Sequence, residues 1–195
     1  MQRSKKPSGV REFTMSSNGD WVSTSMPYLT PRDRGRPDAW GAEAAARGRR
    51  GTQRIVQAGE VPAPRELADL LGVAEGEVVV VRRRVIELDG AASELTDTYY
   101  PVEIARGTPL AGTAKIRGGA VTLLAELGHV GVTVREDVTA RMPSEEERAV
   151  LRTGVDEPVL RLARVTLDGE GRPIQADLMT MPAARQRLHY EIRIG

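Results

Sequence analysis

Cysteine is absent from this chain of 195 residues. Without thiols, the sequence excludes disulfides, thiolate nucleophiles and cysteine metal ligands, and nothing in it indicates an oxidising compartment. Histidine is almost as scarce, because only His129 and His189 are present and they lack the spacing of a metal site. We therefore expect neither a metal centre nor a bound cofactor.

Catalytic motifs and long apolar runs are missing as well. The sequence contains no nucleophile elbow, no glycine-rich phosphate loop and no nucleophile placed beside a base, so we expect a protein that is not an enzyme. No hydrophobic run approaches the length of a membrane span or of the apolar part of a signal peptide. These absences favour a cytoplasmic chain that does not enter a membrane.

Aromatic residues are rare, at 4% of the chain, within a hydrophobic content of 40%. A core of this composition must be packed mainly with Val, Leu, Ile and Ala, and the chain length suits one domain with a tail. Residues 1–37 are rich in polar residues, Gly and Pro and show no hydrophobic period, which predicts a disordered arm and linker. Residues 38–195 are expected to form the domain.

Strand and helix patterns alternate along this domain, and turns such as Asp89-Gly90 join neighbouring strands as hairpins. Hairpin connections favour an α+β fold with an antiparallel sheet and flanking helices. Helices are expected near residues 38–48, 64–72, 120–128 and 143–155, and strands near 52–64, 77–88, 93–101, 132–142, 158–167 and 174–181.

One short stretch, VPAPRELADLLGV at residues 61–73, has the form of the first helix of a helix-turn-helix. Such a motif requires a recognition helix directly afterwards, but residues 78–81 are a β-branched run that predicts a strand. The first third of the chain is basic, which favours either nucleic acid or, in our interpretation, a solvated arm. We expect no sequence-specific DNA contact from this chain.

Two stretches of the domain resemble each other. Residues 61–90 run beside residues 142–171, so that Glu66 matches Glu147 and Arg84 matches Arg164. The physical interpretation is a duplicated unit of helix, strand and hairpin. Two such units that pair their strands would form one continuous antiparallel sheet with pseudo-twofold symmetry. A cleft between the halves is then the expected ligand site, because equivalent side chains converge there.

These repeats, the hairpin return ending in TYYP at residues 98–101 and the stretch from residue 140 to 174 together resemble the UTRA domain. That domain is the effector-binding module of GntR-type transcription regulators in the HutC subfamily, and the resemblance covers about residues 52–195. It implies a fold similar to chorismate lyase, homodimers formed through this domain, and a small polar, often anionic metabolite as ligand. The family's N-terminal winged helix-turn-helix is not found in residues 1–51, so the resemblance implies the sensor half alone.

Arg82 and Arg84 are two residues apart on a predicted strand, so both project from one face while Arg83 points away. Arginine forks suit phosphate or carboxylate groups, and a buried pair is costly without an anionic partner. The resemblance implies that this Arg-x-Arg pair holds the anionic group of the effector. The alternative is that one or both arginines form structural salt bridges across the hairpin with Glu94 or Asp97.

Glu94 and Thr96 share one face of the return strand, where the family places a carboxylate that takes amine or hydroxyl groups of the ligand. The register leaves the choice between the two open, and a solvated strand edge is the alternative. Gly118 and Gly119 precede a predicted helix, whose free backbone N–H groups form either an anion site or a simple turn with a cap.

Gln175 and Asp177 share a face of the last predicted strand and are candidates to close the pocket. The family tends to place Glu near Gln175, Tyr near Met181 and Ser where Gly119 stands. The differences at Gln175 and Met181 imply a changed or lost ligand specificity, and Gly119 lacks the hydroxyl contact of the family.

The leading interpretation is a non-enzymatic ligand sensor that controls transcription through dimerisation. An enzyme on a chorismate-lyase-like scaffold is the first alternative, with Glu94 as its candidate acid or base. The second is a dimerisation-only modulator that forms heterodimers with full-length GntR-type regulators. An intact cavity facing Arg82 and Arg84 would favour the sensor.

Overall fold

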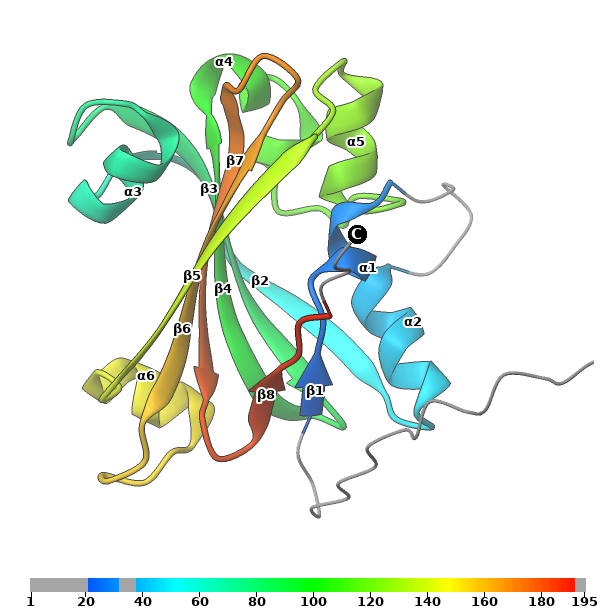
Figure 1. Ribbon diagram of the computed structural model, residues 1–195, viewed down its shortest axis with the longest axis vertical. Coiled ribbons are helices and arrows are strands. Elements are labelled where there is room, and N and C mark those ends of the chain that lie inside the picture. The colour runs from blue at the N-terminus through cyan, green and yellow to red at the C-terminus, as the bar shows by residue number, and fades with distance from the viewer. Residues whose placement is uncertain (1–20, 32–37, 192–195) are drawn as a thin grey trace, which may run out of the picture.

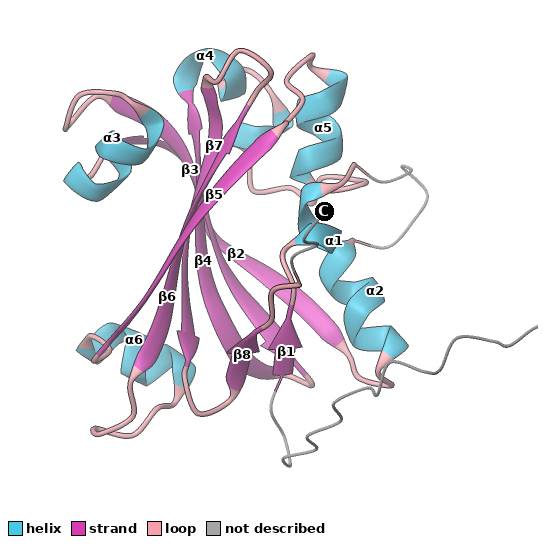
Figure 2. Ribbon diagram, viewed as in Figure 1, coloured by secondary structure: helices cyan, strands magenta, loops and turns pink. Residues whose placement is uncertain are grey.

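The computed structural model describes residues 21–31 and 38–191. Its centre is a six-stranded antiparallel sheet with the strand order β2-β3-β4-β7-β6-β5 (Figures 1 and 2). This confirms the α+β class with an antiparallel sheet. The strands are β2 (Gly51–Pro62), β3 (Val78–Leu88), β4 (Ala91–Pro101), β5 (Thr133–Arg141), β6 (Val159–Leu167) and β7 (Pro173–Pro182).

Helices cover both faces of the sheet (Figure 1). On one face, α3 (Arg65–Leu71) and α6 (Glu145–Leu151) pack against the central strands. The other face carries α1 (Met26–Leu29), α2 (Ala39–Ala46), α4 (Val102–Ala105), the 3₁₀ helix η1 (Pro109–Ala111) and α5 (Ala120–Glu126). Within the described residues, no helix is both long and apolar enough to span a bilayer.

The strand order reflects the duplication. Each half of the chain supplies a strand, a helix and a hairpin: β2-α3-β3-β4 in the first half and β5-α6-β6-β7 in the second. The halves join where β4 pairs with β7, in a register that opposes Thr98 to Asp177 and Thr96 to Met179. This register is symmetric about the Asp97–Leu178 pair. The two units therefore build one continuous sheet, as the repeat predicts.

The junction between α3 and β3 decides whether a DNA-reading motif is present. Gly72 ends α3 in the left-handed conformation (φ 68°), which glycine adopts without steric cost. A turn over residues 74–77 then leads directly into β3. No recognition helix follows α3, in agreement with the strand predicted there.

Residues 21–31 are folded, although the sequence predicts a disordered arm over residues 1–37. Trp21–Ser23 forms β1, which pairs in parallel with β8 (Gln186–Leu188) in a separate two-stranded sheet. Trp21 is only 3% exposed and packs with Trp40 of α2 and Ile86 of β3. The polar composition of this segment gave no sign that Trp21 would pack against Trp40, which lies on α2. The rest of the predicted arm, residues 1–20 and 32–37, lies outside the described residues.

Glu147 ties α6 to the sheet. Ser144 caps the helix by accepting from the Glu147 backbone N–H (3.1 Å), and the Glu147 carboxylate accepts from the Ser144 N–H (2.8 Å), which completes a capping box. Arg141 of β5 donates to both carboxylate oxygens at 2.7 Å. These bonds stabilise the ionised form and, against the effect of burial, lower the pKa of Glu147 from its ordinary 4.5 to about 2.

The lowered pKa predicts an acid-dependent loss of stability. Because the folded state holds Glu147 ionised, its contribution is fully present above pH 4.5 and is lost as the pH falls towards about 2. Glu147→Gln should therefore lower the free energy of unfolding at neutral pH, and the difference from wild type should shrink over that interval. Urea unfolding at a series of pH values measures this difference.

Glu146→Gln is the matched control, because Glu146 is exposed in the same helical turn. It should leave both the stability and its pH dependence nearly unchanged. A difference between Glu147→Gln and wild type that stays constant down to pH 2 would contradict this assignment.

Candidate functional site

A cavity of about 530 Å³ lies between the sheet and the helices of its second face. Its volume lies within the range of small-molecule sites, roughly 300–1,000 Å³. The floor consists of alternate residues of β3, β4, β6 and β7, which a strand directs to one face. All eight candidate effector-binding residues line this cavity: Arg82, Arg84, Glu94, Thr96, Gly118, Gly119, Gln175 and Asp177.

Arg82 is buried, and its hydrogen bonds go to the chain itself. Its guanidinium donates to the carbonyl oxygens of Pro109 (3.0 Å), Ala114 (3.1 Å) and Gly112. Burial lowers the pKa of Arg82, and the neighbouring charge of Arg84 acts in the same direction. Arg82 therefore fixes the loop over residues 109–114 that walls one end of the cavity.

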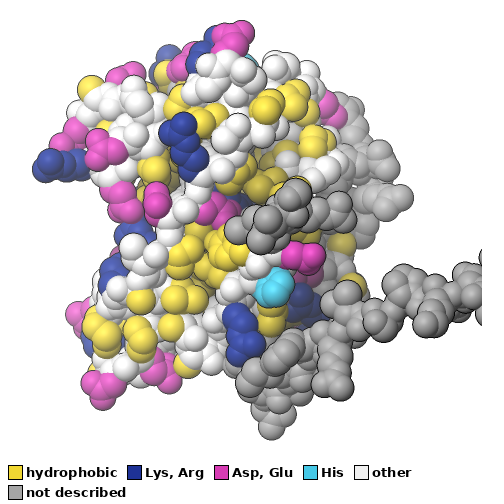
Figure 3. Space-filling view, in the orientation of Figure 1, with side chains coloured by type: hydrophobic (Ala, Val, Ile, Leu, Met, Phe, Trp, Pro, Cys, Tyr) yellow, Lys and Arg dark blue, Asp and Glu magenta, His cyan; other side chains and the backbone are white. Residues whose placement is uncertain are grey.

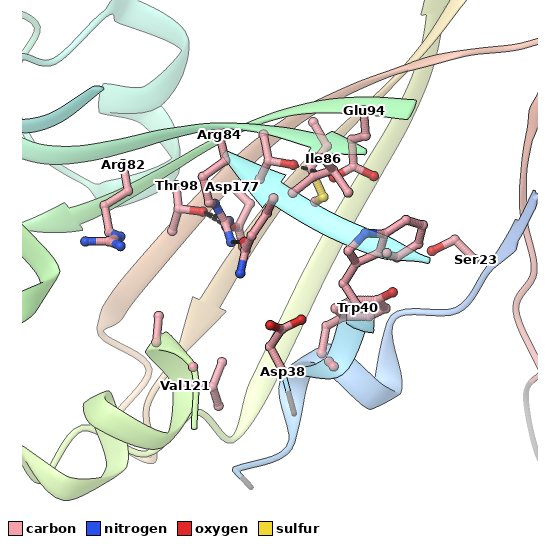
Figure 4. Close-up of a pocket in the computed structure, with 18 of the residues that line it drawn as sticks. Ser23, Asp38, Trp40, Arg82, Arg84, Ile86, Glu94, Thr98, Val121 and Asp177 are labelled. Carbon is pink, nitrogen blue, oxygen red and sulfur yellow. Dashed lines mark hydrogen bonds between the residues drawn. The ribbon is translucent and has the colours of Figure 1, made fainter. Parts of the chain in front are cut away.

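Arg84 belongs to a hydrogen-bonded chain on the cavity floor (Figure 4). It donates from Nη2 to the Thr98 hydroxyl (2.6 Å), which in turn donates to Asp177 Oδ1 (2.6 Å). Gln175 donates to the other oxygen of Asp177 (2.8 Å). Among the described residues, Arg84 makes one further hydrogen bond, a long one to the Gln53 side-chain oxygen (3.4 Å). The hydrogen-bond partners of Arg84 are thus neutral, and Asp177 is connected to Arg84 only through the Thr98 hydroxyl.

Arg164 is the counterpart of Arg84 in the second repeat and also lines the cavity. It forms an ion pair with Glu136 of β5 (2.6 Å) in which both side chains are nearly buried, and it donates to the Ser25 hydroxyl (2.9 Å). Burial opposes ionisation of Glu136, but the Ser25 hydroxyl and the charge of Arg164 lower its pKa overall. The charge of Arg164 is therefore compensated within the chain.

These contacts distinguish three arginines on one floor. Arg82 is satisfied by carbonyl groups and Arg164 by a carboxylate. Among the described residues, no carboxylate lies within ion-pair distance of Arg84, and its buried Nε has no hydrogen-bond partner. The salt bridge to Asp97, which was the alternative considered for Arg82 and Arg84, is formed instead by the exposed Arg83 at 2.9 Å. Arg84 is thus the one arginine of the three that has neither a carboxylate nor a backbone carbonyl partner among the described residues.

Glu94 and Thr96 both face the cavity, and the Thr96 hydroxyl donates to the Glu94 carboxylate. The sequence left open whether Glu94 or Thr96 occupies the ligand-facing position, and in the structure both side chains do. Burial raises the pKa of Glu94, while the Thr96 hydroxyl and the charges of Arg84 and Arg164 oppose the shift. A partly desolvated carboxylate in this position can bind amine or hydroxyl groups.

Gly118 and Gly119 line the cavity ahead of α5, and both have positive φ angles, 78° and 89°. The Gly119 N–H donates to the Ile116 carbonyl (3.1 Å), so one of the expected free donors is already bonded. α5 contains only seven residues. The geometry supports the turn-and-cap interpretation of these glycines at least as well as an anion site.

Unpaired polar atoms are concentrated in the cavity walls. Of the six buried side-chain polar atoms without a partner among the described residues, four belong to cavity-lining side chains: Trp21 Nε1, Arg84 Nε, Gln175 Oε1 and Gln186 Oε1. Each unpaired buried group costs about 1–3 kcal/mol. Two donors and two acceptors around one cavity favour occupation by a polar molecule.

Several cavity residues were not identified from the sequence. Arg164 could have been found, because the repeat aligns it with Arg84, and Thr98 shares the face of Glu94 and Thr96. Trp21 and Trp40 carried no such signal. Within the described residues, no group of His, Asp and Glu side chains is placed to hold a metal ion.

The chain is similar in sequence to the UTRA domain family and to two transcriptional regulators. The model of the UTRA domain family matches residues 46–187. An uncharacterised HTH-type transcriptional regulator of Streptomyces coelicolor is 27% identical over 155 residues, which are 77% of this chain and 57% of that protein. The chain thus spans little more than half the length of the curated relatives it matches.

Solved structures share the fold. PhnF from Mycobacterium smegmatis superimposes with a TM-score of 0.73 at 19% identity, over 90% of this chain and 73% of that one. Its effector domain alone gives 0.67 at 22% identity, over 84% of this chain and 98% of that structure. A putative GntR-family regulator gives 0.76 at 23% identity, with 90% of this chain and 71% of that chain covered.

The contacts of Arg82 predict a structural role that Arg83 lacks. Arg82→Ala should lower the free energy of unfolding, without any ligand, by about 1.5–3 kcal/mol, because a charge-assisted hydrogen bond is lost and loop carbonyls are left buried. Arg83→Ala removes an exposed ion pair and should cost no more than about 1 kcal/mol. Urea denaturation of both variants measures the difference, and equal midpoints would contradict it.

Proposed function

We propose, from the premise that this chain belongs to the UTRA domain family, that it is the ligand-sensing part of a GntR-type regulator of the HutC subfamily. In this proposal the chain binds a small polar metabolite with an anionic group, and binding of that metabolite in the cavity controls transcription. The relatives named as HTH-type transcriptional regulators support a regulatory role. No catalytic step is assigned to the cavity.

The observation that carries the proposal is the state of Arg84. A buried or half-buried cation without a carboxylate partner is costly, and an anionic ligand relieves that cost. The Arg84 fork can donate two parallel hydrogen bonds to a carboxylate or phosphate. The other two arginines of the floor are already satisfied by the protein.

The remaining candidate residues supply the other contacts. Glu94 and Asp177 accept hydrogen bonds, and Gln175 has an unpaired carbonyl oxygen. These acceptors suit hydroxyl or amine groups on a ligand whose anionic group rests on Arg84. Lys115 also lines the cavity wall, but its charge is already paired with Asp38 at 3.0 Å.

The intact cavity favours sensing over the dimerisation-only alternative. A chain that acted solely by forming heterodimers would have no need to keep an uncompensated Arg84 beside a cavity of about 530 Å³. Heterodimers with full-length regulators remain compatible with sensing, since the two roles use different surfaces.

A thermal-shift screen over phosphosugars and small organic acids tests the proposal. A ligand that binds only the folded state raises the melting temperature by mass action. Arg84→Ala should weaken that ligand by ten- to a hundredfold, corresponding to about 1.5–3 kcal/mol for the lost charge-assisted bonds. The unliganded variant should melt close to wild type.

Arg83→Ala is the matched control for this screen, because Arg83 is adjacent in sequence but exposed on the opposite face. It should keep the full ligand-induced shift. If Arg84→Ala retained the shift, or if it destabilised the unliganded chain as strongly as Arg82→Ala, the ligand-binding role of Arg84 would be wrong.

We further propose a twofold homodimer that uses the β5 edge of the sheet. Strand β5 pairs only with β6, so its outer backbone groups are unpartnered among the described strands. Exposed hydrophobic side chains lie on or beside it at Val130, Val132, Val138 and Met142, and hydrophobic side chains gather along the face that β5 crosses (Figure 3). An exposed edge with apolar side chains needs cover, and dimerisation supplies it.

Light scattering tests the dimer. The chain should be dimeric at about tens of micromolar, the range of a specific interface. Val138→Asp, which places a charge on the proposed interface, should raise the dissociation constant by about tenfold or more. Val155→Asp is the control, since Val155 is more exposed than Val138 (69% against 45%) but lies in the loop after α6. A monomeric wild-type chain, or equal effects of both variants, would contradict the assignment.

A further inference from the structure

Residues 21–30, here called the N-terminal strap, form one wall of the cavity. The segment is extended in β1 and helical in α1, and six of its side chains line the cavity: Trp21, Ser23, Ser25, Pro27, Tyr28 and Thr30. Strand alternation directs Trp21 and Ser23 to the same side. The strap lies outside residues 46–187, which the family model matches.

The strap also contacts the floor. Ser25 accepts a hydrogen bond from Arg164 Nη2 (2.9 Å), so the strap helps to orient the arginine that the repeat places opposite Arg84. Tyr28 donates to Glu43 of α2, and the Ser23 carbonyl accepts from the His189 N–H (3.0 Å). The wall is therefore built from a segment far from the floor in sequence.

The attachments of the strap are few. Its backbone pairs with β8 over three residue pairs, in a parallel ladder that is separate from the six-stranded sheet. Trp21 supplies the anchor, with its ring edge-on to Trp40 (centroids 4.8 Å apart) and the Arg47 guanidinium 4.1 Å from its centre. Short parallel pairs are weak on their own. Trp21 is therefore the principal apolar anchor of the strap.

We propose that the strap is a detachable wall of the effector site, held by Trp21, and that it gates entry to the cavity while Ser25 positions Arg164. The inference rests on the proposed function, because a gate matters only to a cavity that binds a ligand. Trp21 Nε1 is buried without a partner when the strap is docked. A ligand that contacts the strap side chains lining the cavity would hold the strap closed, so occupancy and docking are coupled.

Thiol accessibility tests the gate without any effector, and the absence of native cysteine makes a single introduced thiol unambiguous. Met179 lines the cavity floor and is 7% exposed, so Met179→Cys reports access to the cavity. Adding Trp21→Ala should speed its reaction with dithiodipyridine by about tenfold or more, because the rate follows the population of the open state. Arg47→Ala, which removes the contacts of Arg47 to Trp21 and to the Val22 carbonyl, should act in the same direction to a smaller extent.

Val81→Cys is the matched control, because Val81 is fully buried in the core beneath α3, on the opposite face of the sheet. Its reaction rate should stay within about twofold when Trp21 is replaced. Unchanged rates at position 179, or equal acceleration at both positions, would overturn the gate. Neither result depends on finding a ligand, so a failed ligand screen and a failed gate are separate outcomes.

Discussion

The pairing of β4 with β7 is the contact on which the rest of this structure depends. It joins the two repeats into one sheet, and the helices reinforce it by crossing the join: α3 of the first repeat packs on β7 and β6, and α6 of the second packs on β4. Neither half can bury the apolar face of its helix on its own strands alone. The same pairing opposes Thr98 to Asp177 and so creates the polar centre of the cavity floor.

Charge compensation then decides what this floor can bind. Duplication places arginines at equivalent positions, but their surroundings differ because β5 sets Glu136 opposite Arg164, whereas β2 sets Ile55 opposite Arg84. Arg164 meets Glu136 and the strap, whereas Arg84 meets the hydroxyl of Thr98. The sheet is symmetric but the site is not, because the charge of Arg164 is neutralised by Glu136 whereas Arg84 has no carboxylate partner among the described residues. Asymmetry of this kind suits a small ligand that has a single anionic end.

Much of the fold was predictable because it depends on local patterns. Strand alternation, the Asp89-Gly90 turn and the helix near residues 143–155 depend on short stretches of sequence, and each is found near its expected position. The docked strap was not predictable, because a lone Trp21 in a polar segment has no periodic neighbours. Its place depends on Trp40 and on β8, which is contributed by the other end of the chain.

The sequence by itself determined which side chains share a face, because a strand alternates strictly, and six of the eight candidate residues therefore face one cavity from β3, β4 and β7. Gly118 and Gly119 reach the same cavity from the loop before α5. Only the tertiary structure decided what each arginine does there. The partners of Arg82 are backbone carbonyl groups, which every residue possesses and which leave no signature in a sequence. The partners of Arg164 come from Ser25 and Glu136, on segments that only the folded chain brings together. Arg84 remains available to a ligand because no such partner reaches it in the part of the chain that the structure describes.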